Sequence, residues 1–366
     1  MTASVAAGLS GDSGWILTAA TLVVAGLLLV PGWIVGRSAR LAALPSLAVA
    51  PALSSAIIAA AEILAHTLAL PWLPWGWAVI AGLTAVLVLM ARLLVGAPPE
   101  RARRAASQGR AEWVILAAGL TVAVAVPAGV ILSVLPGPGY PAQAFDATFH
   151  LNAVAAIREG GNASMLGGLS ALYSGRAVYY PTVWHGAVAL APGSPAPVST
   201  AGVLALTAVV WPLSLLGLLA RAAGLDAARA SETDRARRRQ RTCAVAAVLA
   251  LSAAVVGFPL LPMTALAVWP YALSVAGLPG VLVLYDLLRQ ETVSWRLRLV
   301  LVLLALAAAG GVVAAHGTGL FNLAVLSPPF LVNLLVSRWR RSATRRGGRA
   351  LLVAGAVASV LVLAMG

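Results

Sequence analysis

Apolar residues run along this chain in long stretches that are separated by short polar segments. A helix rises 1.5 Å per residue, so about 20 apolar residues cross the roughly 30 Å hydrocarbon core of a bilayer. Because lipid cannot satisfy open backbone polar groups, each such stretch predicts a transmembrane helix. The expected fold is all-α, a polytopic transmembrane helix bundle of about ten spans. The spans lie near 15–36, 43–66, 76–96, 113–135, 198–220, 243–262, 268–288, 297–315, 318–336 and 350–366.

Composition agrees with a membrane protein. The chain is 61% hydrophobic and only 10% charged, which is more apolar surface than a soluble core can bury. Its single cysteine, Cys243, excludes an internal disulfide and a cysteine-based metal cage. The sequence contains no phosphate-binding loop, zinc-protease or nucleophile-elbow motif, so nucleotide hydrolysis, zinc proteolysis and serine-hydrolase chemistry have no support.

Arginine predicts the orientation of the bundle. Alternate connections hold 23 of the 25 basic residues, and only Arg158 and Arg176 lie on the other side. Basic loops stay cytoplasmic, so the Arg-rich loops are expected inside the plasma (inner) membrane, against anionic lipid head groups. The N-terminus and the loop 136–197 are then extracytoplasmic. Membrane lipids are expected partners, and nucleic acid is not, because no basic soluble domain exists to bind it.

Three parts follow from this topology. Residues 1–135 form N-terminal transmembrane helices, residues 136–197 form a long extracytoplasmic loop, and residues 198–366 form C-terminal transmembrane helices. The chain stops in an apolar stretch without a polar tail, so we expect it to be part of a longer polypeptide. The loop carries few charges, which favours short helices lying on the membrane surface and folded back over the bundle. These helices are expected at 146–159, at 163–173 and from Pro181 onward.

The candidate chemistry gathers in the stretch "FDATFHLNAVAAIREGGN", residues 145–162. Asp146 and His150 stand at i and i+4 on one helix face, and Asn152 lies between that face and the face of Arg158. Asp146 is either a helix cap or a catalytic carboxylate, and the two roles are compatible. The pair also has metal-ligand spacing, which makes Asp146 and His150 the candidate metal ligands and leaves a divalent ion open as a cofactor.

Other titratable groups are expected at the same end of the bundle. The four histidines all lie at the extracytoplasmic end of a span or in the loop: His66, His150, His185 and His316. Glu62 stands one turn before His66 in the second span, where an unpaired carboxylate is costly. Arg176 departs from the arginine bias and binds either a phosphate or a lipid head group. A titratable cluster at one mouth of a bundle is typical of a functional site, although His150 and His185 also fit packing roles.

Two resemblances rest on these residues. "FDATFHLNAVAAIREGGN" followed by "YYPTVWHGAVAL" is similar to an actinobacterial multi-pass membrane-protein family without an assigned function, which carries D-x-x-x-H-L-N and Y-P-x-x-W-H elements. The bundle with a long outer loop and an early acidic residue resembles the GT-C superfamily of polyprenyl-phosphate-sugar-dependent glycosyltransferases. In that superfamily the loop follows the first span and a second acidic residue adjoins the first, whereas here the loop follows the fourth span and Ala147 adjoins Asp146.

The GT-C resemblance implies an enzyme that transfers a sugar from a lipid-linked donor to a glycan or lipid acceptor of the cell envelope. It implies Asp146 as the catalytic base, and we expect His150 to orient it or to act itself. His185, Arg176, Asn152, His316 and Glu62 are the expected substrate-binding residues. A transporter or flippase for a lipid-linked glycan and a non-catalytic envelope-assembly subunit are the alternatives.

Overall fold

The all-α membrane bundle is confirmed by the computed structural model. It describes residues 11–96, 109–135, 137, 139–140, 142–225, 232–290, 294–330, 332–333 and 336. Seven helices in this part of the chain are long and apolar enough to cross a bilayer. Six of them are single helices: α1 (Gly11–Ser38), α2 (Ala43–Thr67), α3 (Trp72–Val95), α5 (Arg110–Val134), α12 (Trp269–Leu288) and α13 (Trp295–Ala315). The seventh joins α8 (Pro195–Leu204), the π-helical η3 (Ala205–Val210) and α9 (Trp211–Ala222).

The part of the chain that the structure describes contains fewer spans than the ten expected: seven, or eight if one bent helix pair is counted as a span. The sixth expected span is a broken one, in which α10 (Glu232–Ser252) is followed by η4 (Val256–Leu260) and α11 (Leu261–Met263) with a bend of 50°. Prolines in the second piece remove helical donors and account for the break. The ninth expected span appears as a shorter apolar helix, Gly319–Phe330, which includes α14 (Gly319–Leu326). The tenth, 350–366, lies outside the described residues.

Helix α2 is the centre of the bundle and packs against α1, α3, α9, α12 and α13. Glycines of four neighbouring helices lie directly against its backbone: Gly32, Gly217, Gly280 and Gly311. A Cβ atom at Gly311 would lie 1.9 Å from the Ala52 carbonyl oxygen, and one at Gly280 would lie 2.5 Å from the Ala48 carbonyl oxygen. Close approach through small residues is how helices associate in lipid, where apolar burial provides little drive.

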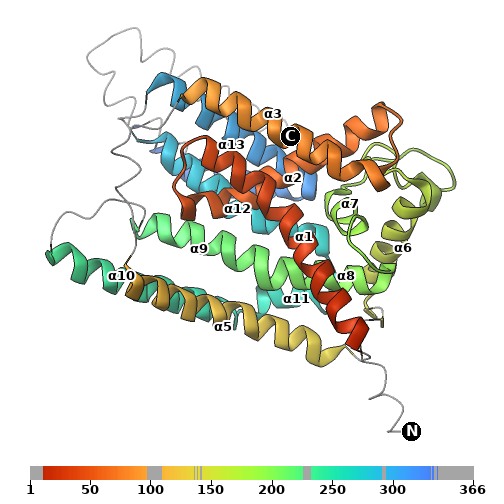
Figure 1. Ribbon diagram of the computed structural model, residues 1–366, viewed down its shortest axis with the longest axis horizontal. Coiled ribbons are helices and arrows are strands. Elements are labelled where there is room, and N and C mark those ends of the chain that lie inside the picture. The colour runs from red at the N-terminus through yellow and green to blue at the C-terminus, as the bar shows by residue number, and fades with distance from the viewer. Residues whose placement is uncertain are drawn as a thin grey trace.

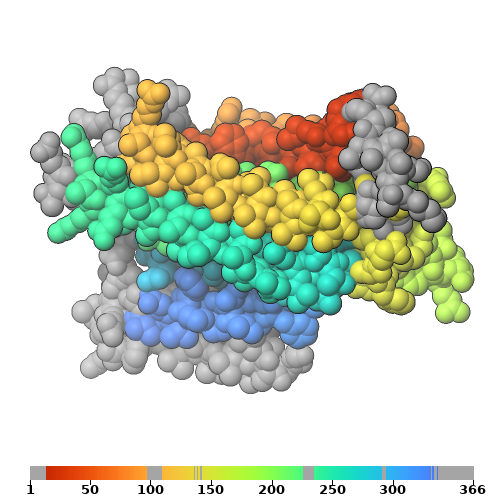
Figure 2. Space-filling model, turned by 90° about the horizontal axis from the view of Figure 1, so that it is seen from below, coloured from red at the N-terminus to blue at the C-terminus, as the bar shows by residue number. Residues whose placement is uncertain are grey.

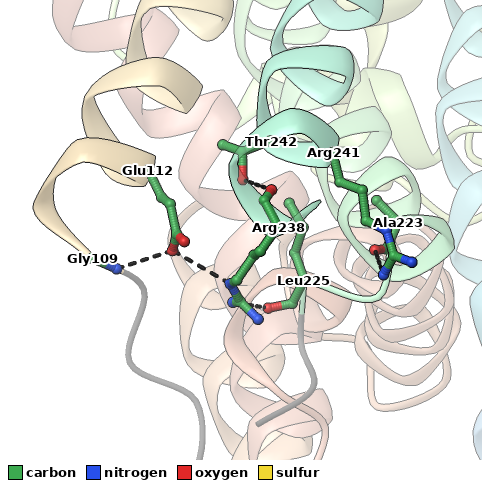
Figure 3. A network of polar contacts seen from close by, with 7 residues as sticks. All are labelled: Gly109, Glu112, Ala223, Leu225, Arg238, Arg241 and Thr242. Atoms are coloured by element: carbon green, nitrogen blue, oxygen red, sulfur yellow. Dashed lines mark hydrogen bonds and ion pairs between the residues drawn. The ribbon is translucent and has the colours of Figure 1, made fainter. Parts of the chain in front are cut away.

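At the Arg-rich end of the bundle, polar contacts connect α5, α10 and the end of α9 (Figure 3). Helices α5 and α10 lie side by side along one face of the molecule (Figure 2). At this end Glu112 of α5 accepts from the Gly109 amide at 3.0 Å and pairs with the Arg238 guanidinium of α10 at 3.4 Å. Arg238 also donates to the Leu225 carbonyl at 2.5 Å, which ties both helices to the end of α9.

The loop elements gather at one end of the bundle (Figure 1). The first expected loop helix is confirmed as α6 (Phe145–Gly160), and the third is α7 (Val183–Ala189), which begins two residues after Pro181. The expected helix over 163–173 is wrong, since only Ser170–Tyr173 forms a short 3-10 turn, η2. Gly167 in this stretch has a φ of +113°, which a continuous helix cannot accommodate. All of α7 is buried, and it packs against α2, α6, α8 and α12.

Candidate functional site

Two buried histidines join the loop helices. Helix α6 buries Ala147, His150, Val154 and Ile157, at the three- and four-residue spacing of one helix face. That face meets α7, where His185 is completely buried. His150 Nδ1 and His185 Nε2 lie 2.9 Å apart, within hydrogen-bonding distance. The D-x-x-x-H and W-H elements of the sequence therefore converge on one contact.

Aromatic rings enclose this histidine pair. The Trp184 ring of α7 and the Trp269 ring of α12 are fully buried, with centroids 5.0 Å apart. Trp269 lies 5.2 Å from the His150 ring, and Tyr180 lies 5.7 Å from the His185 ring in an edge-on arrangement. We call these five side chains, from His150, Tyr180, Trp184, His185 and Trp269, the aromatic–histidine layer.

Burial keeps both imidazoles of the layer neutral. Desolvation lowers the pKa of His150 to about 4, the Ala267 backbone opposes this shift, and the charge of His316 reinforces it. Desolvation also lowers the pKa of His185 well below its usual value, with a further contribution from His150 and an opposing one from the Pro181 backbone. Near neutral pH one ring therefore donates an N–H to the lone pair of the other.

Asp146 lies beside this layer, half-buried in the first turn of α6. Ala144 occupies the N-cap position, so Asp146 stands within the helix, where the positive end of the helix dipole favours a carboxylate. The pKa of Tyr180 is raised by burial, and the charges of Tyr173 and Asp146 add to the rise.

Glu62 lies on the other side of α7. It is buried, and its Oε2 accepts a hydrogen bond from Thr182 Oγ1 at 2.9 Å. Its Oε1 fills the space beside Gly186, where a Cβ atom would lie 2.0 Å away. The Gly186 carbonyl accepts from Trp72 Nε1 at 2.9 Å. Glu62 thus holds α7 against the spanning helices, and its neighbour His66 is exposed.

The remaining expected site residues are spread around this centre. His316 follows the last residue of α13, contacts Thr318 Oγ1 at 2.7 Å through Nδ1, and packs edge-on against Tyr271 with centroids 5.8 Å apart. Asn152 and Arg176 are exposed and take no part in the histidine contact.

The described residues do not fit the metal site that the sequence left open. Within the described ranges no group of three His, Cys, Asp or Glu side chains is placed to hold an ion. His150, one of the two candidate ligands, directs Nδ1 at His185 and interacts with the Ala267 backbone.

Several residues that build the site were not predicted from the sequence. Tyr180 and Thr182 flank Pro181 in the quoted "YYPTVWHG" stretch, but nothing in its pattern indicated their partners. Trp269 is about 120 residues away from His150 along the chain, and only the fold brings the rings together. Arg158 donates to the Ala189, Ala191 and Gly193 carbonyls and so clamps the end of α7 to α6.

The fold and this site define a multi-pass α-helical membrane protein with a buried polar and aromatic centre at one end of its bundle. Residues 25–366 match the model of a family of unknown function, DUF6541. The chain belongs to that family, since the match covers most of its length. Comparisons with curated proteins and with solved structures gave no match.

Proposed function

We propose that the chain is a membrane glycosyltransferase of GT-C-like type. It moves a sugar from a polyprenyl-phosphate donor to a cell-envelope glycan or lipid at the extracytoplasmic end of the bundle. The observation that carries the proposal is the position of Asp146. It is a half-buried carboxylate in the first turn of α6, one turn before His150, on a helix that the aromatic–histidine layer fixes in place.

The chemistry needs one base and one bound phosphate. Asp146 removes the proton of an acceptor hydroxyl as that oxygen attacks the anomeric carbon of the donor sugar. The bond from the anomeric carbon to the phosphate oxygen breaks, and polyprenyl phosphate leaves with the bonding electron pair. The proton passes from the Asp146 carboxyl to water.

The surroundings of Asp146 suit a lipid-linked donor. The adjacent Phe145 side chain is 94% exposed, which is expected where a site opens toward acyl or prenyl chains. Arg176 is exposed in the same loop and supplies a guanidinium for the donor phosphate. The buried layer is the rigid support, because precise placement of a base is worth several orders of magnitude in rate.

A transfer assay tests the proposal. The full chain in lipid nanodiscs is incubated with radiolabelled polyprenyl-phosphate monosaccharides and with glycolipids extracted from the source cells as acceptors. Asp146→Asn should lower transfer at least a hundredfold, whereas Glu159→Gln, an exposed acid on the same helix, should leave it unchanged. The alternatives give different results. Cargo that crosses vesicles with its glycosidic bond intact indicates a transporter or flippase, and full transfer by Asp146→Asn removes the catalytic assignment.

A further inference from the structure

A pocket lies at the opposite end of α6 from Asp146. The two ends are 14 residues apart, which is about 20 Å along a helix. The pocket has a volume of about 270 Å³ and is lined by His66, Ala69, Leu70, Pro71, Gly160, Gly161 and Asn162. None of the residues assigned to the transfer chemistry lines it, so it is a separate site.

The ends of three helices meet at the pocket. Gly161 ends α6 in the left-handed region, with a φ of +67°, and its amide donates to the Ile157 carbonyl at 2.9 Å. Its own carbonyl accepts from the Trp72 amide at 2.7 Å, which fixes α6 to the start of α3. The last turn of α2 contributes His66, and the chain then passes through Leu70 and Pro71.

The charge of these walls restricts the ligand. The C-terminal ends of α2 and α6 meet the N-terminal end of α3, whose N-cap is Pro71, so their opposed helix dipoles offset one another. The lining residues include no lysine or arginine, so an anion would have no charged partner. The lining residues include no carboxylate, so a metal cation would lack the charged ligands it prefers. A neutral ligand with hydroxyl donors satisfies both conditions, because hydroxyls donate to carbonyl oxygens and accept from the His66 ring or the Asn162 amide.

The size of the pocket restricts the ligand further. Pockets for drug-sized molecules measure roughly 300–1,000 Å³, and this one is slightly smaller. We propose that the pocket between the ends of α2 and α6 binds a single neutral sugar ring, either of a free glycan or of a glycolipid head group. This inference is independent of the transfer reaction at Asp146 and concerns binding alone.

Gly160 allows a sharp test. Gly160 lines the pocket, and a Cβ atom there meets nothing within 4 Å, so a larger side chain is accommodated without striking the protein. Gly160→Leu should block the pocket, and Gly160→Ala is the matched control that leaves most of the space open. His66→Ala removes a side chain that is already exposed and so tests recognition without loss of folding.

Binding is measured by saturation-transfer NMR with the full chain in nanodiscs. A panel of neutral methyl glycosides probes the free glycan, and the same sugars on a lipid in the nanodisc probe a head group. We expect binding of at least one sugar that Gly160→Leu weakens tenfold or more, that His66→Ala weakens, and that Gly160→Ala and Asp146→Asn retain. Binding that survives in Gly160→Leu, no binding of any sugar in either form, or Gly160-dependent binding of calcium or inorganic phosphate instead would overturn the proposal. Because Asp146→Asn keeps the pocket, failure of the transfer assay and failure of this test are separate results.

Discussion

His150 Nδ1 and His185 Nε2 meet at 2.9 Å although 35 positions of sequence separate the two residues. The contact joins α6 to α7 one helical turn after Asp146, and both rings are buried. A single hydrogen bond between neutral, desolvated groups therefore helps to set the position of the proposed catalytic helix.

Removal of one partner should destabilise this end of the bundle. His185→Ala leaves the His150 nitrogen without its partner and opens a cavity, so we expect a loss of about 2–4 kcal/mol in the free energy of unfolding. Thermal unfolding in detergent measures the change. His66→Ala, an exposed histidine at the same end, should change stability by less than about 0.5 kcal/mol. Equal effects of the two variants would contradict a structural role for the pair.

Acid should weaken the same region. The unfolded histidine has its ordinary pKa of 6.5, whereas the folded His150 has a pKa of about 4, so the unfolded chain binds more protons between these values. Stability is therefore complete above pH 6.5 and decreases as the pH falls toward 4. The decrease for His150 alone is on the order of 3 kcal/mol. In the variant His150→Gln the pH dependence of the unfolding temperature over this window should be markedly smaller, and an unchanged slope would count against the buried neutral pair.

The close fit of α7 on α2 predicts a specific steric effect. A methyl group at Gly186 would lie 2.0 Å from Glu62 Oε1, so Gly186→Ala should destabilise the chain by about 1–3 kcal/mol. Gly129→Ala is the matched control, because a Cβ atom there meets nothing within 4 Å. If the clash is the cause, adding Glu62→Ala should reduce the cost of Gly186→Ala in a double-mutant cycle. Independent, additive effects would argue that α7 packs differently.

Two ion pairs at the Arg-rich end should differ in strength. Arg238 and Glu112 are both buried, and Arg238→Ala should cost about 3–5 kcal/mol because it removes a cation that is paired with a buried carboxylate. Arg221 and Asp286 lie 2.7 Å apart, but the Asp286 side chain is 43% exposed. Arg221→Ala should therefore cost no more than about 1 kcal/mol. Chemical denaturation of both variants compares the two, and the reverse order would show that the α5–α10 contact is misassigned.

The sequence predicted those helices that depend only on residues close together along the chain. Spans such as 43–66 appear close to their expected limits as α2, because length and apolarity alone determine a membrane helix. Helix α6 was also predicted, since Gly160–Gly161 provides a clear stop. The expected helix over 163–173 was wrong because a positive φ at Gly167 breaks it, and composition alone did not indicate that conformation.

The site was predicted only in part, and the reason is long-range packing. The i and i+4 spacing of Asp146 and His150 indicated a shared face, but that face turns His150 toward His185 and the ring of Trp269. Glu62 accepts a hydrogen bond from Thr182, which is 120 positions away, and its spacing from His66 in the same helix gave no sign of that partner. Such partners depend on how the loop folds over the bundle, and helical periodicity carries no information about that.

The proposed sugar transfer requires α6 to lie on the extracytoplasmic side of the membrane. The side on which α6 lies is therefore the most direct test of the proposed function. Single cysteines at the exposed positions Asn152 and Gln240 are introduced into a Cys243→Ser background, and intact cells are treated with a membrane-impermeant maleimide. We predict that Asn152→Cys is labelled in intact cells and that Gln240→Cys is labelled only after permeabilisation. Labelling of Gln240→Cys alone in intact cells would reverse the orientation and contradict an extracytoplasmic glycosyltransferase.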